Sequence, residues 1–309
     1  MIEYFKTVEG RIEKQKEYTS DGVWVNSLNP SESELRFISK KFGIDYNFLK
    51  IASDEEESSH IDIEDGIVLI VIDFPVVEKI DKNHIYYTMP LGIFITQNDV
   101  ITISLKNNEV LDTIKTKKKS SINTKDKTNF VLNLILQNVI KYLRYLNKII
   151  KTCDKIEHVL RKAMKNKELI QLLEIKKSLV YFSSSLKTMK VTVEKLFRSK
   201  FLTIGENDRE LLDDVIIELK QAIEMSDTYL NILSGTMEAF ASIISNNLNI
   251  VMKILASVTL IISIPTVISG IYGMNTPNFP MMEFWWFPVI LSFVLMYISY
   301  IFLKKKDMF

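Results

Sequence analysis

The C-terminal part of the chain holds two long runs of residues with no acidic or basic side chain, 254–272 and 285–303. A helix that crosses the hydrocarbon core of a bilayer needs about 20 apolar residues, each adding a rise of about 1.5 Å. Both runs meet that length, and core helices of soluble proteins seldom extend so far without a charge. The sequence therefore predicts two membrane-spanning helices joined by a short outer loop, 273–284.

Positive charges near the ends of these runs predict their orientation. Lys253 precedes the first run, and the tail 304–309 begins with three lysines. Lysine at the membrane boundary favours the cytoplasmic side. Residues 1–14 lack the apolar centre of a signal peptide. We expect a protein of the cytoplasmic (inner) membrane, with both termini in the cytoplasm.

Composition argues against several other classes of protein. The 309 residues carry a formal net charge of +1, so a nucleic acid is not an expected partner. Cys153 is the only cysteine, which predicts neither a disulfide framework nor a cysteine-based metal site. The nine glycines form no GxxxxGK or GxGxxG phosphate-binding loop, and no nucleophile–base set can be assembled. We therefore do not expect an enzyme.

Residues 1–122 have the pattern of a cytoplasmic α/β domain. Runs rich in β-branched and aromatic residues predict strands at 22–29, 66–77, 84–89 and 92–105. Between the first two, residues 30–43 have the signals of a helix. Ser31 stands three residues before Glu34, as in a capping box, and Gly43 provides a stop.

Residues 123–253 have the pattern of a helical stalk. Apolar residues recur every three or four positions from Leu132 to Ala163, a second helix is expected at 167–201, and Gly205 breaks the pattern. A third helix, capped by Asn207, then continues without proline over 208–264 and enters the first membrane span. About 60 helical residues would extend about 90 Å. Such a helix cannot bury its apolar side alone, so we expect neighbours from its own chain and from identical subunits.

One face of the first span is unusual. Stepping by three or four residues from Met252 meets Leu255 and then only small or hydroxylated side chains: Thr259, Ser263, Thr266, Gly270 and Gly273. Small residues allow transmembrane helices to pack closely, and the same face could instead line a pore. Periodicity leaves both explanations open.

Four segments of the chain resemble the CorA family of magnesium channels. "YGMN" (Tyr272–Asn275) ends the first of the two C-terminal spans, and "NIVMKIL" (Asn249–Leu255) stands at its membrane entry. "IASDEEESSHIDIE" (Ile51–Glu64) is similar to an acidic segment of the family's N-terminal domain, and lysines close the second span. With the long helix that feeds the first span, the resemblance covers the whole chain.

The resemblance implies an α+β membrane protein that assembles as a homopentameric funnel in the lipid bilayer. The first span of each subunit would line one central pore, and the second would lie outside it. Gly273, Met274 and Asn275 match the family's selectivity filter, with five Asn275 carbonyl oxygens facing the ion. The positions that match its pore lining and gate are Asn249, Met252, Leu255, Thr259, Ser263, Thr266 and Gly270.

Such a filter suits Mg²⁺, which gives up its water reluctantly and prefers octahedral oxygen. A ring of neutral carbonyls can hold the hydrated ion by hydrogen bonds without binding it too tightly. The negative end of the helix dipole would lie near the filter, where a cation enters. Rings of Met252 and Leu255 could gate by dewetting.

Regulation by cytoplasmic Mg²⁺ is a further hypothesis that the resemblance implies. Asp214 matches a carboxylate that helps bind regulatory magnesium between subunits, and Asp213 and Glu218 are its neighbours. Copies of these acids would repel one another unless a divalent cation bridged them. The simpler alternative is that the three acids only solvate the helix.

We therefore expect passive Mg²⁺ influx, gated by Mg²⁺ bound between subunits. A related alternative is the same architecture carrying Co²⁺, Ni²⁺ or Zn²⁺, or working as an exporter. A more distant one is a membrane-anchored scaffold or sensor. The outer loop departs from the family because Pro280-Met281 replaces a frequent Pro-Glu pair and Glu283 is its only acid, which weakens the capture of cations.

Overall fold

The computed structural model describes residues 1–19, 21–80, 83–116, 122–162, 166–198, 205–274, 281 and 284–308. These residues form two compact units, Met1–Gly235 and Thr236–Phe309. The division between the units falls at Gly235 and marks no boundary at 122 or 253. The domain boundaries expected at these two positions therefore stay predictions.

A seven-stranded mixed sheet forms the centre of the first unit. Its strands are β1 (Ile2–Val8), β2 (Arg11–Gln15), β3 (Val23–Leu28), β4 (His60–Glu64), β5 (Ile67–Ile80), β6 (Asn83–Ile95) and β7 (Val100–Ser104). The strand order is β2-β1-β3-β7-β6-β5-β4. Only β3 and β7 pair in parallel among the described strands.

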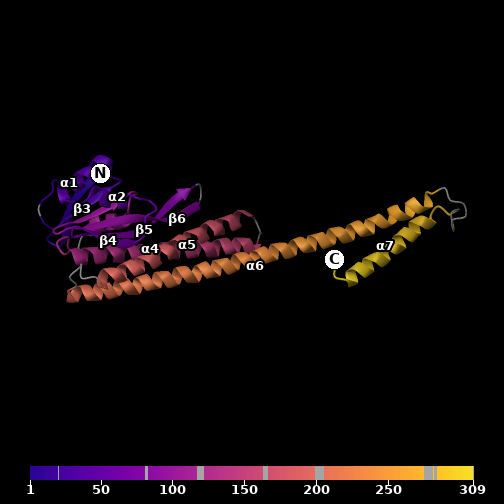
Figure 1. The fold of residues 1–309 in the computed structure, drawn as a ribbon. Coiled ribbons are helices and arrows are strands. Elements are labelled where there is room, and N and C mark those ends of the chain that lie inside the picture. Colours follow the sequence, from indigo (N-terminus) through magenta and orange to yellow (C-terminus); the bar gives the residue numbers. More distant parts are fainter. Residues whose placement is uncertain are drawn as a thin grey trace. The chain divides into compact units, whose positions relative to one another are not determined.

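Helices cover both faces of this sheet (Figure 1). On one face, α1 (Glu32–Phe42) and α2 (Tyr46–Ile51) pack on alternate strand residues such as Val23 and Val71. On the other face lie α4 (Lys127–Lys162) and α5 (Asn166–Arg198), where the rings of Trp24 and Phe130 meet at 5.2 Å. A short helix, α3 (Glu109–Thr116), precedes α4. The two layers bury the sheet on both faces.

Local sequence signals predicted several of these elements correctly. Ser31 Oγ accepts a hydrogen bond from the Glu34 N–H at 3.3 Å, and the Glu34 carboxylate accepts one from the Ser31 N–H at 3.0 Å. Gly43 ends α1 at φ 68°. The capping box and the glycine stop are both confirmed. The run 92–105 is not one strand, however, because the segment 96–99 separates β6 from β7.

The long helix is confirmed, with one correction at its start. α6 spans Glu206–Tyr272, 67 residues, and includes Pro265. Asn207 was expected to cap it, and that is wrong because Asn207 lies inside the helix. The Gly205 N–H instead donates to Asp208 Oδ2 at 2.9 Å, so Asp208 reaches back from the first turn. The second apolar helix, α7 (Phe287–Lys305), begins two residues later than the predicted span.

Candidate ion pathway

Hydrogen bonds between α5 and α6 hold the first part of α6 in place. Val215, Leu219 and Ala222 are buried there, and Ser226 Oγ donates to the Leu179 carbonyl at 3.2 Å. One residue further, the Asp227 carboxylate accepts hydrogen bonds from Ser183 Oγ at 2.6 Å and Lys187 Nζ at 2.8 Å. Burial raises the pKa of Asp227, but these two donors outweigh it and the pKa is lowered. A charged Asp227 therefore holds this part of the helix.

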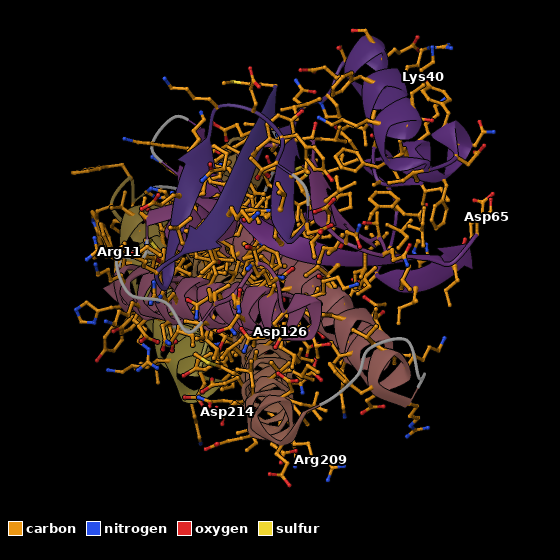
Figure 2. All side chains as sticks on the ribbon, turned by 90° about the vertical axis from the view of Figure 1, so that its left-hand side faces the viewer. Arg11, Lys40, Asp65, Asp126, Arg209 and Asp214 are labelled. Carbon is orange, nitrogen blue, oxygen red and sulfur yellow. The ribbon has the colours of Figure 1, made fainter. Side chains whose placement is uncertain are left out.

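Asp213 and Asp214, the predicted regulatory acids, are exposed on α6. Because a helix turns by about 100° per residue, Asp213 points away from the side that buries Val215. Figure 2 shows Asp214 at the surface near the start of α6. Neither acid has an ion pair or hydrogen bond within the described part of the chain. Three or more potential metal ligands do not come together anywhere in that part.

In the second unit, contacts at both ends of α7 join it and the turn that follows it to α6. At one end the rings of Tyr272 and Phe287 lie 6.1 Å apart, and at the other Ser257 Oγ donates to the Met308 carbonyl at 3.1 Å. The helices therefore run antiparallel. Both are long and apolar enough to cross a membrane.

Packing against α7 divides α6 into two faces. Ser257 is 1% exposed and Ile268 is 7% exposed, and the partly buried Ile261 and Ile264 lie between them on the same side. Of the predicted pore-lining positions, Asn249 lies about 90° around the helix from this side, and the others lie about 130–180° from it. All of them are exposed: Asn249, Met252, Leu255, Thr259, Ser263, Thr266 and Gly270. No other described residue of the chain covers this face, which we call the open face of α6.

Hydroxyl groups on the open face donate to their own helix. Thr259 Oγ1 donates to the Leu255 carbonyl and Ser263 Oγ to the Leu260 carbonyl, both at 2.8 Å. Each hydroxyl oxygen keeps lone pairs, so it can still accept a hydrogen bond from a water molecule. The open face thus offers acceptors in an otherwise apolar setting.

The predicted filter begins where α6 ends. The Gly273 N–H donates to the Ser269 carbonyl at 2.9 Å and the Met274 N–H to the Ile271 carbonyl at 3.3 Å, which tightens the last turn. A Cβ on Gly273 would lie 3.0 Å from the Ser269 oxygen, so a larger residue would crowd the turn. Met274 is 56% exposed. Asn275, the third residue of the predicted filter, lies outside the described residues.

Sequence reasoning missed the bond between Ser257 and Met308. It depends on the way α7 ends: Asp307 has φ 53°, and the N–H groups of Asp307 and Met308 donate to the carbonyls of Lys304 and Leu303. These two bonds form a Schellman motif, in which a left-handed residue turns the chain back. Aspartate tolerates a left-handed conformation better than most residues. Asp307 was therefore the one signal in the sequence for this turn.

Comparisons with known proteins agree with this arrangement. The family described as CorA-like Mg2+ transporter protein matches residues 19–305. A cobalt/magnesium transport protein CorA of Methanocaldococcus jannaschii is 31% identical over 92% of this chain and 90% of its own length. The corresponding protein of Thermotoga maritima is 23% identical over 98% of this chain and 88% of its own length.

A solved structure extends the likeness to three dimensions. The complete structure of the CorA magnesium transporter from Methanocaldococcus jannaschii superimposes with a TM-score of 0.80 at 25% identity, covering 99% of this chain and 96% of that one. The long helix, the two apolar helices and the sheet domain all fall within the matched length. The chain therefore belongs to the family of CorA-like Mg2+ transporter proteins.

Proposed function

We propose that identical copies of this chain form a channel for Mg²⁺, with the open face of α6 lining the pore. The observation that carries the proposal is that α7 covers only the side of α6 around Ser257 and Ile268. The opposite side, which holds Thr259 and Ser263, leads to Gly273. Five subunits, the number that the family resemblance implies, would place five open faces around one axis.

Burial of apolar surface supports assembly into an oligomer. Residues 241–256 of α6 are all exposed in the single chain, and they include Leu248 (61% exposed) and Met252 (56% exposed). Exposed apolar patches of this kind mark contacts with lipid or with other subunits. Apolar rings of Met252 and Leu255 at the pore would close it to water and ions when they narrow.

The direction of transport follows from the expected topology. With both termini in the cytoplasm, the Gly273–Asn275 filter is the outer entrance. A membrane potential negative inside contributes about 2.3 kcal/mol per charge for each 100 mV, and a divalent ion carries two charges. Inward flow therefore needs no ATP.

Regulation would use the exposed acids of the stalk. Asp213 and Asp214 have no cationic partner in the described part of one chain, so acids from neighbouring subunits could share a bound Mg²⁺. Bridging would hold the subunits together and keep the pore closed at high cytoplasmic Mg²⁺. Loss of the ion would restore repulsion between the acids and open the pore.

Replacement of Asn275 tests the filter. In proteoliposomes, Asn275→Ala should abolish Mg²⁺ uptake while the native mass of the oligomer stays unchanged, because in the proposed filter the amide would face the ion and not the subunit interface. Asn278→Ala, in the same loop, is the matched control and should retain uptake. Undiminished uptake by Asn275→Ala would disprove the filter and favour a membrane-anchored scaffold or sensor.

Replacement of the two stalk acids tests regulation. The double variant Asp213→Asn, Asp214→Asn should need about tenfold more cytoplasmic-side Mg²⁺ for half-maximal inhibition of uptake, the equivalent of about 1.4 kcal/mol. Glu210→Gln, an exposed acid of the same helix, should leave that concentration unchanged. An unaltered inhibition curve in the double variant would mean that these acids only solvate α6.

A second candidate is the same channel carrying other ions. The relatives named for both cobalt and magnesium favour this variation, since Co²⁺ and Ni²⁺ hydrate much as Mg²⁺ does. Uptake of Mg²⁺ in competition with Co²⁺, Ni²⁺ and Zn²⁺ ranks the ions. Zn²⁺ transport coupled to protons, or export against the potential, would overturn passive Mg²⁺ entry.

A further inference from the structure

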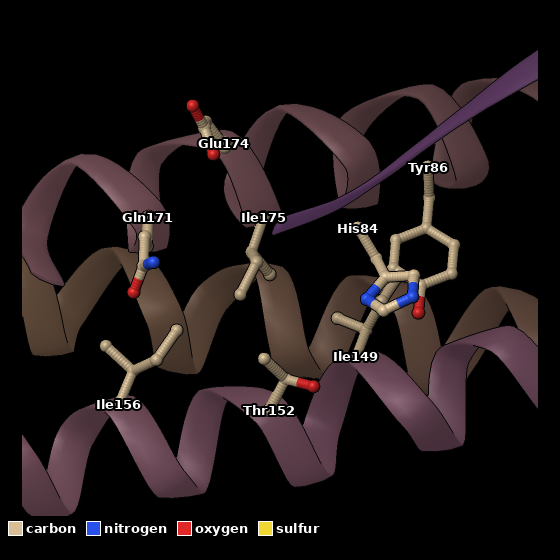
Figure 3. Close-up of a pocket in the computed structure, with 8 residues that line it drawn as sticks. All are labelled: His84, Tyr86, Ile149, Thr152, Ile156, Gln171, Glu174 and Ile175. Carbon is tan, nitrogen blue, oxygen red and sulfur yellow. The ribbon is translucent and has the colours of Figure 1, made fainter. Parts of the chain in front are cut away.

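Three elements of the first unit line a cavity of about 220 Å³, which opens to solvent beside the exposed residues His84 and Thr152. Figure 3 shows its walls: the start of β6 supplies His84 and Tyr86, and α4 and α5 supply the rest. Its apolar lining consists of Ile149, Ile156 and Ile175. A closed apolar cavity of about 150 Å³ binds benzene, so by volume this one has room for an aromatic ring with a few further atoms, and its lining adds the polar groups of His84, Thr152 and Gln171.

An aromatic layer adjoins the cavity. Between the same three elements, the ring of Tyr86 lies 5.4 Å from that of Tyr145 and 6.2 Å from that of Phe182. Phe182 meets Tyr142 at 4.9 Å. One to two turns further along α4, Ile149 and Thr152 occupy the equivalent positions with smaller side chains. These rings meet tilted or edge-to-face, and a planar ring in the cavity would add another contact of that kind.

The Tyr86 hydroxyl is the polar group that a ligand would satisfy. Tyr86 is only 7% exposed, and its backbone N–H donates to Ser178 Oγ at 3.3 Å. Its hydroxyl, however, has no hydrogen-bond partner among the described residues. Burial raises the pKa of this phenol, so it stays neutral and able to donate. The hydroxyl oxygen is not fully buried, so it can exchange a hydrogen bond with a hydroxyl on a ligand in the cavity.

The charges around the cavity select against an anion. The described lining residues include no lysine or arginine, their one imidazole belongs to His84, and their one carboxylate belongs to Glu174. In Figure 3 this carboxylate points away from α4. An anionic ligand would thus lose hydration and meet a carboxylate but no lysine or arginine, whereas an uncharged ligand has no such penalty.

We propose that this cavity is a binding site for a small uncharged aromatic molecule that carries one hydrogen-bonding group, of the size of a phenol. The ring lies between the isoleucines and the edge of Tyr86, and its polar group exchanges a hydrogen bond with the Tyr86 hydroxyl. Bound there, the molecule joins β6, α4 and α5. Since α5 also holds Asp227 of α6, the ligand stiffens the layer to which the stalk is attached.

The test follows the ¹⁹F resonance of 4-fluorophenol with the full-length protein in detergent. For a ligand of this size we expect saturable binding with Kd on the order of 0.1–1 mM. Fluorobenzene, which lacks the hydroxyl, should bind several-fold more weakly, and 4-fluorobenzoate should not bind. Absence of saturable binding, or preferred binding of the benzoate, would overturn the proposal.

Two kinds of variant distinguish binding of the ligand in the cavity from its partition into detergent. Tyr86→Phe should weaken 4-fluorophenol binding about three- to tenfold and leave fluorobenzene unaffected, because one hydrogen bond is lost. The matched control Tyr87→Phe removes a hydroxyl that donates to Glu78 instead, and should bind like the wild type.

Filling the cavity should remove binding altogether. Ile175→Phe places a larger side chain in the cavity. Thr152→Leu fills it from α4 and serves as the second variant if Ile175→Phe does not fold. Val159→Phe adds a ring to an exposed position of α4 that does not line the cavity, so its binding should be unchanged. Saturable binding that survives in both filled variants would place the ligand elsewhere and disprove the assignment.

Discussion

Asp73 is a buried acid on β5 without a cationic partner in the described part of the chain. It is 8% exposed. Burial raises the pKa of its carboxyl, and hydrogen bonds from Ser185 and Ser59 only partly oppose that effect. Around it, Asn138 Nδ2 donates to the Asp73 carbonyl at 2.7 Å, and Tyr142 shares a 2.7 Å bond with Ser185. The acid therefore destabilises the fold when it is charged.

Asp73→Asn should stabilise the protein, and more so at higher pH. Because the pKa is raised in the folded state, the stability associated with the protonated acid is complete below the unfolded pKa and is lost as pH rises through the folded pKa. At pH 8 the variant should unfold about 2–4 °C higher than the wild type, and the difference should shrink toward pH 4. Thermal unfolding across this range is the measurement. Asp62→Asn, on the exposed strand β4, should show no such trend.

Residues with local partners could be predicted from sequence, and residues with distant partners could not. Ser31, Glu34 and Gly43 lie within one helix and its caps, so their roles follow from spacing alone. The environment of Asp73 depends on Ser185 and Asn138, which are far away in the chain. In the sequence Asp73 looks like one polar residue in an apolar strand.

Among the secondary-structure elements, α7 is fixed to α6 by a hydroxyl that behaves differently from its neighbours. Thr259 and Ser263 donate to carbonyls of their own helix, whereas Ser257 donates to Met308 beyond the end of α7. Leu303, which closes the Schellman motif with Met308, is 6% exposed. This bond holds the end of α7 about half a turn of α6 from the predicted gate residue Leu255 and about one and a half turns from Met252.

Ser257→Ala should loosen the end of α7 without dissociating the oligomer. Loss of one hydrogen bond, about 1 kcal/mol, should speed hydrogen exchange in residues 304–308 about fivefold. Ser263→Ala is the matched control, since its hydroxyl bonds within α6. Mass spectrometry of peptides from the end of α7 reads the exchange rate. Equal rates in the two variants would show that Ser257 does not hold this turn.

The sequence was sufficient to predict that α6 is one helix, but not what each of its faces contacts. Periodic apolar residues and the absence of proline over 208–264 were sufficient for one continuous helix. They left open whether the small residues of the first span face α7 or a pore. The choice depends on which side of α6 is buried, the side of Ser257 and Ile268, and no local pattern specifies which helix a face will meet.

For the whole molecule, the open face of α6 predicts which residues meet across subunits. On a Cys153→Ser background, Thr259→Cys should give disulfide-linked dimers under mild oxidation, because the proposed channel places copies of this face around one axis. Ser257→Cys should not, because α7 covers that position. The native mass in detergent should correspond to five chains. Cross-linking of Ser257→Cys but not Thr259→Cys would place the pore on the other side of the helix.

The number of subunits could not be predicted from the residues themselves. It depends on the angle at which two copies of α6 meet, which is set by contacts between chains. The "YGMN" segment and the two apolar runs indicate the family, and subunit number rests on that resemblance. The regulatory role of Asp214 is similar, since its partners would belong to another subunit.

The cavity beside Tyr86 has a mechanical consequence. Hydrostatic pressure favours states in which water fills loosely packed space, because the volume of the system then falls. The first unit should therefore be compressible where β6 meets α4 and α5, and pressure should open this corner before the sheet. A ring inserted there, by mutation or by a bound guest, would make the corner resistant to compression.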